Sequence, residues 1–444
     1  MKYDDTIVAI STPVGTGGIG IIRVSGSEAI NIVNKSCDKN LLKVESHTIN
    51  YGHILDDERA VIDEVLIMLM KAPKTFTREN IVEINCHGGV IVLNKVLMQI
   101  IKNGARLAEN GEFTKRAFLN GRIDLSQVEA VMDIIEAKTE LSLTQAINQL
   151  DGKLSHKIKM YQQELLEIIA KIEVSIDYPE YDEDLSVRFE ADVKRLCSNL
   201  KVLLQTADTG QIIRDGVKAV IIGEPNVGKS SLLNILLEQN KAIVTDVAGT
   251  TRDSIEVYFN IEGVPFILFD TAGIRDTVDT VEKIGVMRSK QLVEQADLVI
   301  MVMDSQKKVS NNEKDILQSI KDKKVIYVQN KIDLGQSNIL SDDDIQISTV
   351  TGDGIEKLKQ VMKDTVMNKG ISIEGSISNI RQKQALVNAI QSLDKAYAAI
   401  KISMPEDLIV IDLHESYGHL GMIIGETLKE EIINELFEKF CLGK

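Results

Sequence analysis

Hydrophobic residues recur at three- and four-residue spacing in two long stretches of the chain. The first covers residues 124–207 and includes Leu154, Ile158 and Leu165, with polar residues between them. The second covers residues 371–440. This period is typical of amphipathic helices. The two stretches predict one helical domain made of both blocks, although a plain helical spacer would give the same periodicity.

The first 120 residues show a different pattern. Short runs of β type, Ile7–Ile10, Gly20–Val24 and Glu64–Met68, are separated by glycine-rich turns, and a helical pattern covers Val90–Lys102. This alternation predicts a compact α+β domain. The glycine-rich segment Ser11–Gly18 contains no lysine and fits no nucleotide fingerprint, so it is predicted to be a loop.

Between the helical stretches lie three apolar runs of strand type, Lys218–Ile222, Val264–Phe269 and Lys324–Gln329. A chain of 444 residues exceeds the size at which single cores stop growing, about 250–300 residues. We therefore expect an α/β domain inserted in the helical one. The predicted domains are residues 1–120 (α+β), 121–214 (first helical part), 215–368 (inserted α/β) and 369–444 (second helical part).

Charge and cysteine content restrict the function. The formal net charge of -15 argues against strong nonspecific binding of nucleic acid, which depends on Lys and Arg contacts, so any RNA contact should be local or shared with a partner. The four cysteines lack C-x-x-C spacing, which indicates neither a zinc site nor a disulfide framework. We expect a cytoplasmic protein without signal peptide or membrane span.

The run Gly223–Ser230 fits the P-loop pattern G-x-x-x-x-G-K-[ST], after an apolar strand and before a helical segment. Backbone N–H groups of such a loop surround phosphate oxygens, Lys229 would neutralise their charge, and the Ser230 hydroxyl would coordinate Mg²⁺. A glycine-rich turn without a ligand is the alternative, but it would leave three later motifs unexplained. The motif predicts a nucleoside triphosphate site.

Those later motifs indicate guanine as the base. The run Asp270–Gly273 follows a strand and suits the metal's water shell and the γ-phosphate. The carboxylate of Asp333, in Asn330–Asp333, is placed to accept from guanine N1–H and its amine, a donor pair that adenine lacks. Ser348 and Thr349 resemble the last base-contacting loop, and the motif order resembles translation-factor-class GTPases.

The hydrolytic machinery differs from that of Ras-like proteins. Ile274 stands where they carry a water-orienting glutamine. Asn226 and the loop Thr245–Asp253 resemble the potassium-activated GTPases, in which such residues hold a monovalent cation. By that resemblance K⁺ is bound by Asn226, Thr245, Val247 and Thr250, and Mg²⁺ by Ser230 and Thr251. An ordinary switch I turn is the alternative.

Four strings at distant places resemble the MnmE/TrmE family of tRNA-modifying GTPases. They are Gly18–Gly26, Glu83–Gly89, Gly111–Leu125 and the terminal Lys439–Lys444. The resemblance implies an N-terminal domain that binds 5-formyltetrahydrofolate or a related folate through Arg23, Glu83, Arg122 and Lys444. It also implies a possible chemical role for Cys441 and a water-orienting role for Glu282.

The resemblance further implies the activity and the partners. Such a protein is a homodimer that joins the FAD-dependent MnmG (GidA) subunit in a heterotetramer or larger complex. Together they add an aminomethyl or carboxymethylaminomethyl group to C5 of wobble uridine in tRNA. A ribosome-assembly or RNA-checkpoint GTPase, and a folate enzyme with a regulatory GTPase, are the alternatives.

The catalytic candidates are Asn226, Lys229 and Glu282. The residues predicted to contact GTP are Asn226, Val227, Gly228, Lys229, Ser230, Ser231, Thr245, Asp246, Val247, Ala248, Gly249, Thr250, Thr251, Asp270, Thr271, Ala272, Gly273, Asn330, Lys331, Asp333, Ser348 and Thr349.

Overall fold

The computed structural model describes residues 5–178, 185–239, 257–268, 293–307, 310–321, 323–335, 344–367, 373–426, 430–438, 440 and 443–444. The chain forms two compact units. One joins residues 1–132 to residues 424–444, and the other comprises residues 133–423.

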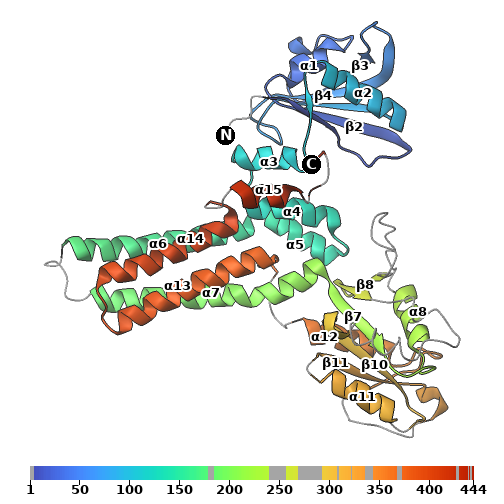
Figure 1. The fold of residues 1–444 in the computed structure, drawn as a ribbon, viewed down its shortest axis with the longest axis vertical. Helices are drawn as coiled ribbons and strands as arrows, with labels where there is room; N and C mark the ends of the chain where they lie inside the picture. Colours follow the sequence, from blue (N-terminus) through green and yellow to red (C-terminus); the bar gives the residue numbers. More distant parts are fainter. Residues whose placement is uncertain are drawn as a thin grey trace. The chain divides into compact units, whose positions relative to one another are not determined.

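The first unit contains a mixed sheet with the strand order β3-β4-β5-β2-β1-β6. Its strands are β1 (Ile7–Ile10), β2 (Gly17–Ser25), β3 (Thr48–Leu55), β4 (Val61–Met70), β5 (Ile81–Gly88) and β6 (Arg106–Leu107). Two helices, α1 (Ala29–Lys35) and α2 (Val90–Lys102), lie on one face of this sheet (Figure 1). The core between them is formed by residues such as Val24, Ile67 and Val96, all nearly inaccessible to solvent.

A second, smaller core of this unit joins segments that are distant in sequence. The helices α3 (Glu112–Leu119), α4 (Leu125–Glu136) and α15 (Glu430–Glu438) contribute to it. Phe437 and Phe440 pack there with Ala117, Leu125 and Val128. The last residues of the chain therefore complete the unit that the first residues begin.

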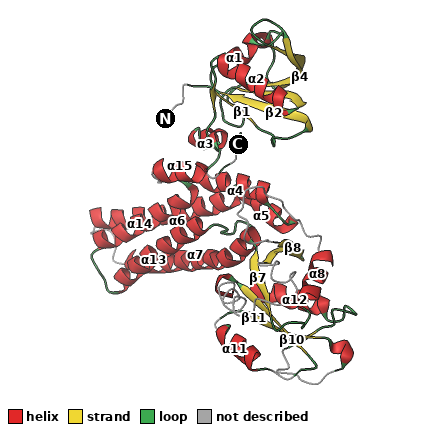
Figure 2. Ribbon diagram, turned by 45° about the vertical axis from the view of Figure 1, so that its right-hand side comes forward, coloured by secondary structure: helices red, strands yellow, loops and turns green. Residues whose placement is uncertain are grey.

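The second unit contains long helices and a separate sheet (Figure 2). Its helical part comprises α5 (Glu140–Leu150), α6 (Lys153–Asp177), α7 (Leu185–Asp215), α13 (Ile380–Lys401) and α14 (Glu406–Ile424), with α7 packed against both α6 and α13. Apolar positions at helical spacing, such as Leu165, Ile168 and Ile172, are buried. Apolar residues recur at three- and four-residue spacing here because they form the buried face of the helix.

The sheet of the second unit has the order β12-β11-β10-β7-β9-β8, with all neighbours parallel except β8 and β9. Its elements are β7 (Val217–Ile222), α8 (Lys229–Gln239), β8 (Val257–Ile261), β9 (Val264–Leu268), β10 (Leu298–Asp304), α11 (Asn311–Ser319), β11 (Val325–Asn330), η2 (Ile332–Leu334), β12 (Ile345–Gln346) and α12 (Ile355–Val366). The order β11-β10-β7-β9 leaves the carboxyl ends of the central strands at one edge, where ligands of such sheets bind.

The predicted fold class is confirmed: an α/β P-loop domain lies between helical segments that follow an α+β domain. The predicted domain limits stay a prediction. Among the described residues, none of the helices is both long and apolar enough to cross a membrane.

Candidate functional site

The P-loop connects β7 to α8, and its backbone conformation requires glycine at two positions. Gly223 has φ +148 and Gly228 has φ +100. A Cβ on Gly223 would lie 2.1 Å from the Val302 carbonyl oxygen, and one on Gly228 would lie 2.1 Å from Asn330 Nδ2. Asn226 also adopts a positive φ, +64, as asparagine tolerates better than most residues. Successive backbone N–H groups in such turns form an anion-binding concavity.

Lys229 is held at the base of this loop. Its Nζ donates to the carbonyl oxygens of Gly223, at 2.9 Å, and Glu224, at 2.6 Å. Burial lowers the pKa of Lys229 because it removes the ammonium group from water. A bound phosphate would place a negative charge beside this buried ammonium group. The loop therefore fits a phosphate chain.

Asn330, at the end of β11, ties the P-loop to the last loop of the domain. This fully buried side chain donates through Nδ2 to the Val227 carbonyl oxygen, at 2.8 Å, and lies 3.3 Å from Thr349 Oγ1. Its Oδ1 accepts from the Thr349 backbone N–H, at 3.1 Å. Asn330 thus fixes the spacing between the phosphate loop and the predicted base loop.

A hydrogen bond from Ser348 orients the predicted base-binding carboxylate of Asp333. Asp333 is exposed, and its Oδ1 accepts from the hydroxyl of the buried Ser348, at 2.6 Å. Lys331, at φ +68, extends its Nζ to Asp304 Oδ2, at 2.8 Å. Burial alone would raise the pKa of Asp304, but the hydrogen bonds from Lys331 and the Gln306 backbone N–H, together with the nearby lysine charges, lower that pKa overall. These contacts fix the loop around an accessible carboxylate.

A second group of predicted residues meets in the first unit. Arg23 on β2 and Glu83 on β5 are direct cross-strand partners, and Arg23 Nε donates to Glu83 Oε1, at 2.8 Å. Arg23 also donates through NH1 to the Gly443 carbonyl oxygen, at 3.3 Å, and the Phe113 N–H donates to the Lys444 oxygen, at 3.1 Å. The structure therefore brings Lys444 to the Arg23–Glu83 pair.

Two phenylalanines connect Arg122 to the same place. The guanidinium carbon of Arg122 lies 4.9 Å from the centre of the Phe76 ring. That of Arg23 lies 5.9 Å from Phe76 and 5.6 Å from Phe113. Stacked cations of this kind are held electrostatically by the ring faces. Arg23, Glu83, Arg122 and the chain end thus surround one aromatic pair.

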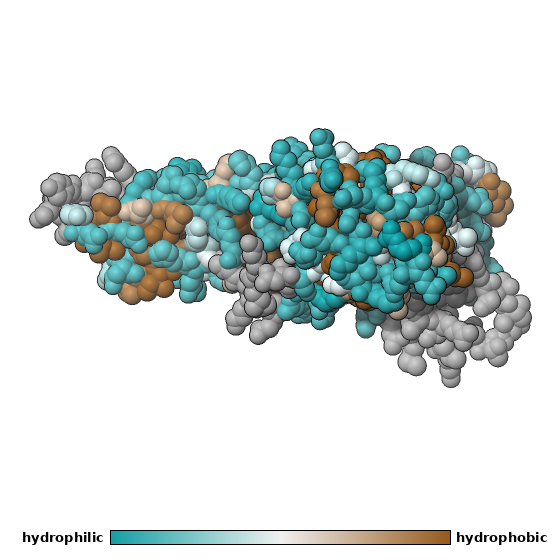
Figure 3. Space-filling view, turned by 90° about the horizontal axis from the view of Figure 1, so that it is seen from above, coloured by the Kyte–Doolittle hydropathy of each residue, from teal (hydrophilic) through white to brown (hydrophobic). Residues whose placement is uncertain are grey.

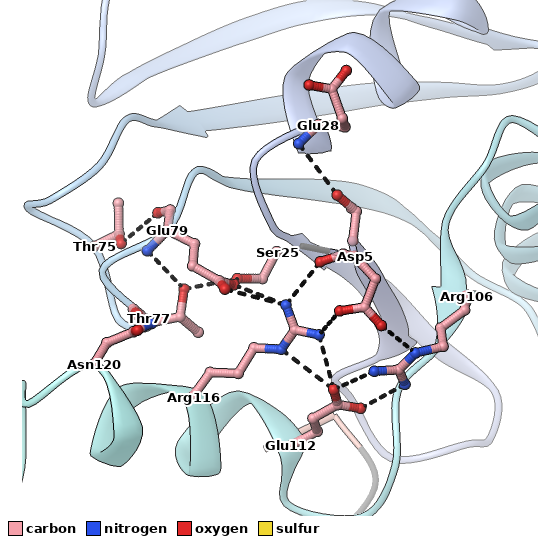
Figure 4. A network of polar contacts seen from close by, with 11 residues as sticks. Asp5, Ser25, Glu28, Thr75, Thr77, Glu79, Arg106, Glu112, Arg116 and Asn120 are labelled. Carbon is pink, nitrogen blue, oxygen red and sulfur yellow. Dashed lines mark hydrogen bonds and ion pairs between the residues drawn. The ribbon is translucent and has the colours of Figure 1, made fainter. Parts of the chain in front are cut away.

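A buried polar network holds α3, which carries Phe113 (Figure 4). Arg116 is fully buried, and its guanidinium donates to Asp5 Oδ1, at 2.7 Å, and to Glu112 Oε1, at 2.9 Å, with Glu79 Oε1 at 3.2 Å. Arg106 donates through Nε to Asp5 Oδ2, and through NH1 and NH2 to both carboxylate oxygens of Glu112. The network fixes α3 against the sheet.

Gly443 packs closely against the end of β1, at Ile10 and Ser11. Its φ is +88, and a Cβ there would lie 2.4 Å from the Ile10 carbonyl oxygen. The Ser11 hydroxyl donates to the Gly443 carbonyl oxygen, at 3.2 Å. Only glycine fits this approach, which sets the position of Lys444.

Two family models match the chain. Residues 6–122 match the GTP-binding protein TrmE N-terminus, and residues 125–441 match the MnmE helical domain. The chain is 49% identical over 456 residues to the tRNA modification GTPase MnmE of Latilactobacillus sakei subsp. sakei (strain 23K), covering 99% of this chain and 98% of that protein. The chain belongs to the MnmE family of tRNA modification GTPases.

Two further MnmE relatives match over the full length. The tRNA modification GTPase MnmE of Acetivibrio thermocellus is 48% identical, with 100% of both chains covered. That of Streptococcus thermophilus is 49% identical, covering 100% of this chain and 99% of its own. As a member of the MnmE family, the chain is a GTP hydrolase that binds GTP with Mg²⁺.

The described residues of the P-loop site fit GTP bound with Mg²⁺. The glycines let the P-loop pack against Val302 and Asn330, and Ser230, exposed in the first turn of α8, offers the hydroxyl oxygen that Mg²⁺ prefers. Bound Mg²⁺ neutralises the charge that develops on the phosphates. Lys229 would hold the phosphates, and Asp333 would orient the base.

Several predicted residues lie outside the described part of the chain. They are Thr245, Asp246, Val247, Ala248, Gly249, Thr250, Thr251, Asp270, Thr271, Ala272, Gly273, Glu282 and Cys441. Their assignments stay predictions.

The sequence analysis missed three residues of these sites. Asp304, the partner of Lys331, had a detectable signal, because a carboxylate at the end of a wholly buried parallel strand lies at the ligand edge. Phe76 and Phe113 had none, since neither stands in an aromatic pattern.

Proposed function

We propose that the chain is a potassium-activated GTPase that works with an FAD- and NADH-using partner subunit on tRNA. Together they install an aminomethyl or carboxymethylaminomethyl group at C5 of the wobble uridine, with a folate as one-carbon donor. The observation that carries this proposal is the convergence of Arg23, Glu83, Arg122 and Lys444 around Phe76 and Phe113, in a chain that also has a guanine-type P-loop site.

The chemistry of that convergence suits a folate. A pterin is a flat ring with a donor edge, and its glutamate tail carries carboxylates. Glu83, half-buried beside Arg23, can accept from the donor edge, whereas guanidinium groups suit carboxylates in two-point contacts. The half-buried Phe76 ring, backed by the buried Phe113, supplies apolar surface for the pterin plane.

A variant at Glu83 tests this folate assignment. We expect Glu83→Gln to weaken binding of 5-formyltetrahydrofolate at least tenfold in titration calorimetry, because the amide presents a donor to the pterin's donor edge. Glu64→Gln, an exposed change on the adjacent strand β4, is the matched control. Equal folate affinities of the two variants would contradict the assignment.

The potassium assignment is supported by the P-loop. Asn226 is exposed, and its positive φ turns this residue of the loop outward. Ile274 carries no group that can orient water, so another charge must stabilise the transition state. A monovalent cation held by Asn226 would supply it.

GTP turnover in KCl and NaCl at equal ionic strength tests this role. We expect a K⁺-specific gain of at least tenfold in the unaltered protein. Asn226→Gly should abolish the gain, because glycine keeps the left-handed backbone and removes only the amide. Equal rates of the unaltered protein in both salts would exclude a catalytic K⁺.

The proposed homodimer is supported by apolar side chains on the sheet of the first unit. Ile49 and Tyr51 on β3 and Leu66 on β4 are 66%, 57% and 47% exposed. Hydrophobic residues are also visible in separate patches on the face drawn in Figure 3. Sedimentation equilibrium of the full chain, with Tyr51→Glu as the variant, measures the oligomeric state.

The reaction itself is tested by mass spectrometry of tRNA nucleosides. Deletion of this chain should remove the side chain at C5 of wobble uridine, and the unaltered gene should restore it. Unchanged nucleosides together with accumulated ribosomal precursors would favour an RNA-checkpoint GTPase instead.

A further inference from the structure

Three cationic residues of the first unit stand close to Phe76: Lys74 and Arg78 lie two positions before and after it in the chain, and Arg122 stacks on its ring. Lys74, Arg78 and Arg122 are all exposed, and among the described residues no carboxylate lies within ion-pair distance of them. In a chain with a formal net charge of -15, such a cluster is a local exception. It defines a basic patch of these three residues.

The patch is built by two loops that hydrogen-bond to each other. Arg78 NH1 donates to the Asn120 carbonyl oxygen, at 2.8 Å, and Asn120 Nδ2 donates back to the Thr77 carbonyl oxygen, at 2.7 Å. Arg122, two residues after Asn120, stacks on Phe76. These contacts fix Arg78 and Arg122 relative to Phe76, and Lys74 belongs to the same loop as Arg78.

The acidic residues of the same loops are turned away from the patch. Glu79 points inward, where it accepts from Arg116 and from the Ser25 hydroxyl (Figure 4). Asp124 accepts from the Ser126 hydroxyl, at 2.7 Å, and from the Gln127 N–H, at 3.1 Å, at the start of α4. Glu79 is paired with Arg116, and within the described part of the chain Asp124 forms no ion pair with the patch, so no salt bridge from its own loops holds the three cations.

Arg78 has a strained backbone conformation. Arg78 has φ +62, a conformation that β-carbon-bearing residues other than Asn and Asp rarely adopt. Such a conformation persists where the surrounding structure fixes it. Here the turn around it is fixed by the Thr75 hydroxyl, which donates to the Glu79 carbonyl oxygen, at 2.6 Å. The turn presents Arg78 outward and Glu79 inward.

We propose that the basic patch binds the sugar–phosphate backbone of the tRNA next to the base that is modified. The inference rests on the proposed function, because it places the RNA strand against the proposed folate site, which shares Arg122 with the patch. Lysine and arginine contacts to phosphates position a nucleic acid without reading its sequence. A patch of this size, in an acidic chain, supplies a local RNA contact and not general RNA affinity.

Binding of a fluorescein-labelled tRNA transcript to the full chain tests the patch. Anisotropy is measured between about 50 and 200 mM KCl, since each phosphate contact contributes roughly 0.7–0.9 to the slope of log K against log salt. We expect Lys74→Gln/Arg78→Gln to weaken binding about tenfold at the lower salt and to reduce the slope by about 1.4–1.8 for two lost contacts. Lys74→Gln alone, which leaves the strained turn untouched, should give about half of the slope change.

The matched control is Lys43→Gln/Lys95→Gln, which removes two exposed lysines elsewhere in the first unit. It should keep the affinity and slope of the unaltered protein. Binding of 5-formyltetrahydrofolate by each variant reports whether the folate site is intact. A patch variant with unaltered affinity and slope would overturn the inference, as would an unaltered protein that binds no tRNA. The proposed function is judged separately, by the wobble nucleosides of the deletion strain.

Discussion

At the scale of single residues, Arg116 shows how a charge is made tolerable inside the protein. Its side chain is fully buried, and the carboxylates of Asp5, Glu79 and Glu112 surround it. Burial would lower the pKa of Arg116, but the hydrogen bond to Glu112 and the nearby carboxylates outweigh it and raise that pKa. The arginine is therefore charged throughout the accessible pH range, and its partners depend on it.

Removing that charge should be costly. Arg116→Met leaves the buried Glu112 facing Arg106 alone and Glu79 without its cation, so we expect a loss of about 3–5 kcal/mol in stability of the first unit. Scanning calorimetry of the full chain measures the shift of the corresponding transition. Lys115→Met, one position earlier on α3 at a half-buried site, should shift it far less.

His87 forms an ion pair whose contribution to stability depends on pH. Its Nδ1 and backbone N both lie near the carboxylate of Asp63, at 2.7 and 2.8 Å, and that hydrogen bond raises the pKa of His87. A raised pKa in the folded state means that the contribution to stability is complete below the unfolded value of about 6.5 and is lost as pH rises through the folded value.

An NMR titration of the His87 ring tests this. We expect its midpoint to lie above that of an ordinary histidine, and Asp63→Asn to lower it. A midpoint that does not move in the variant would show that Asp63 does not set the charge of His87.

At the scale of elements, the P-loop shows why its glycines are required. Gly228 and Gly335 have the same φ, +100, but a Cβ on Gly228 would meet Asn330 Nδ2 at 2.1 Å, whereas nothing lies within 4 Å of one on Gly335. An alanine at position 335 would therefore add backbone strain alone, whereas an alanine at position 228 would add both strain and a steric clash. The clash would push apart the loops that Asn330 holds together.

We expect Gly228→Ala to lower GTP affinity at least a hundredfold, measured with a fluorescent GTP analogue. Gly335→Ala carries the backbone strain alone, which is about 1 kcal/mol or somewhat more, so its affinity should fall by tenfold or less. Similar losses in both variants would indicate that strain, and not contact with Asn330, determines the shape of the loop.

Elements with a strong local pattern were predictable, and contacts across the chain were not. β1 and α2 have the predicted limits, because the continuous apolar run over Ile7–Ile10 and the helical period over Val90–Lys102 are local properties. The P-loop and the Asp333 loop were predictable from their motifs. The role of Asn330 between two loops and the stacking of Arg122 on Phe76 depend on residues 103 and 46 positions apart, and no local pattern records such pairs.

At the scale of the whole molecule, the first unit is assembled from both ends of the chain. Phe437 and Phe440 fill the core formed by Ala117, Leu125 and Val128. The residues of the proposed folate site all lie in this first unit. The P-loop and base loops lie wholly within residues 133–423.

Truncation after residue 423 should therefore separate the activities. The shortened chain lacks α15, Gly443 and Lys444, so we expect loss of 5-formyltetrahydrofolate binding and a lowered calorimetric transition of the first unit, with basal GTP turnover kept within about twofold. Phe437→Ala in the full chain should weaken the same transition by about 3–5 kcal/mol. Normal folate binding by the truncated chain would contradict this assignment.

The dependence of the first unit on residues 424–444 also sets an order of events during synthesis. After residue 132 leaves the ribosome, 292 further residues (424 − 132) must be translated before the start of its closing segment is made. At roughly 5–20 residues per second this delay is about 15–60 s. Throughout that interval the apolar surface around Leu125 and Val128 lacks Phe437 and Phe440, so the nascent chain exposes apolar side chains that the finished protein buries.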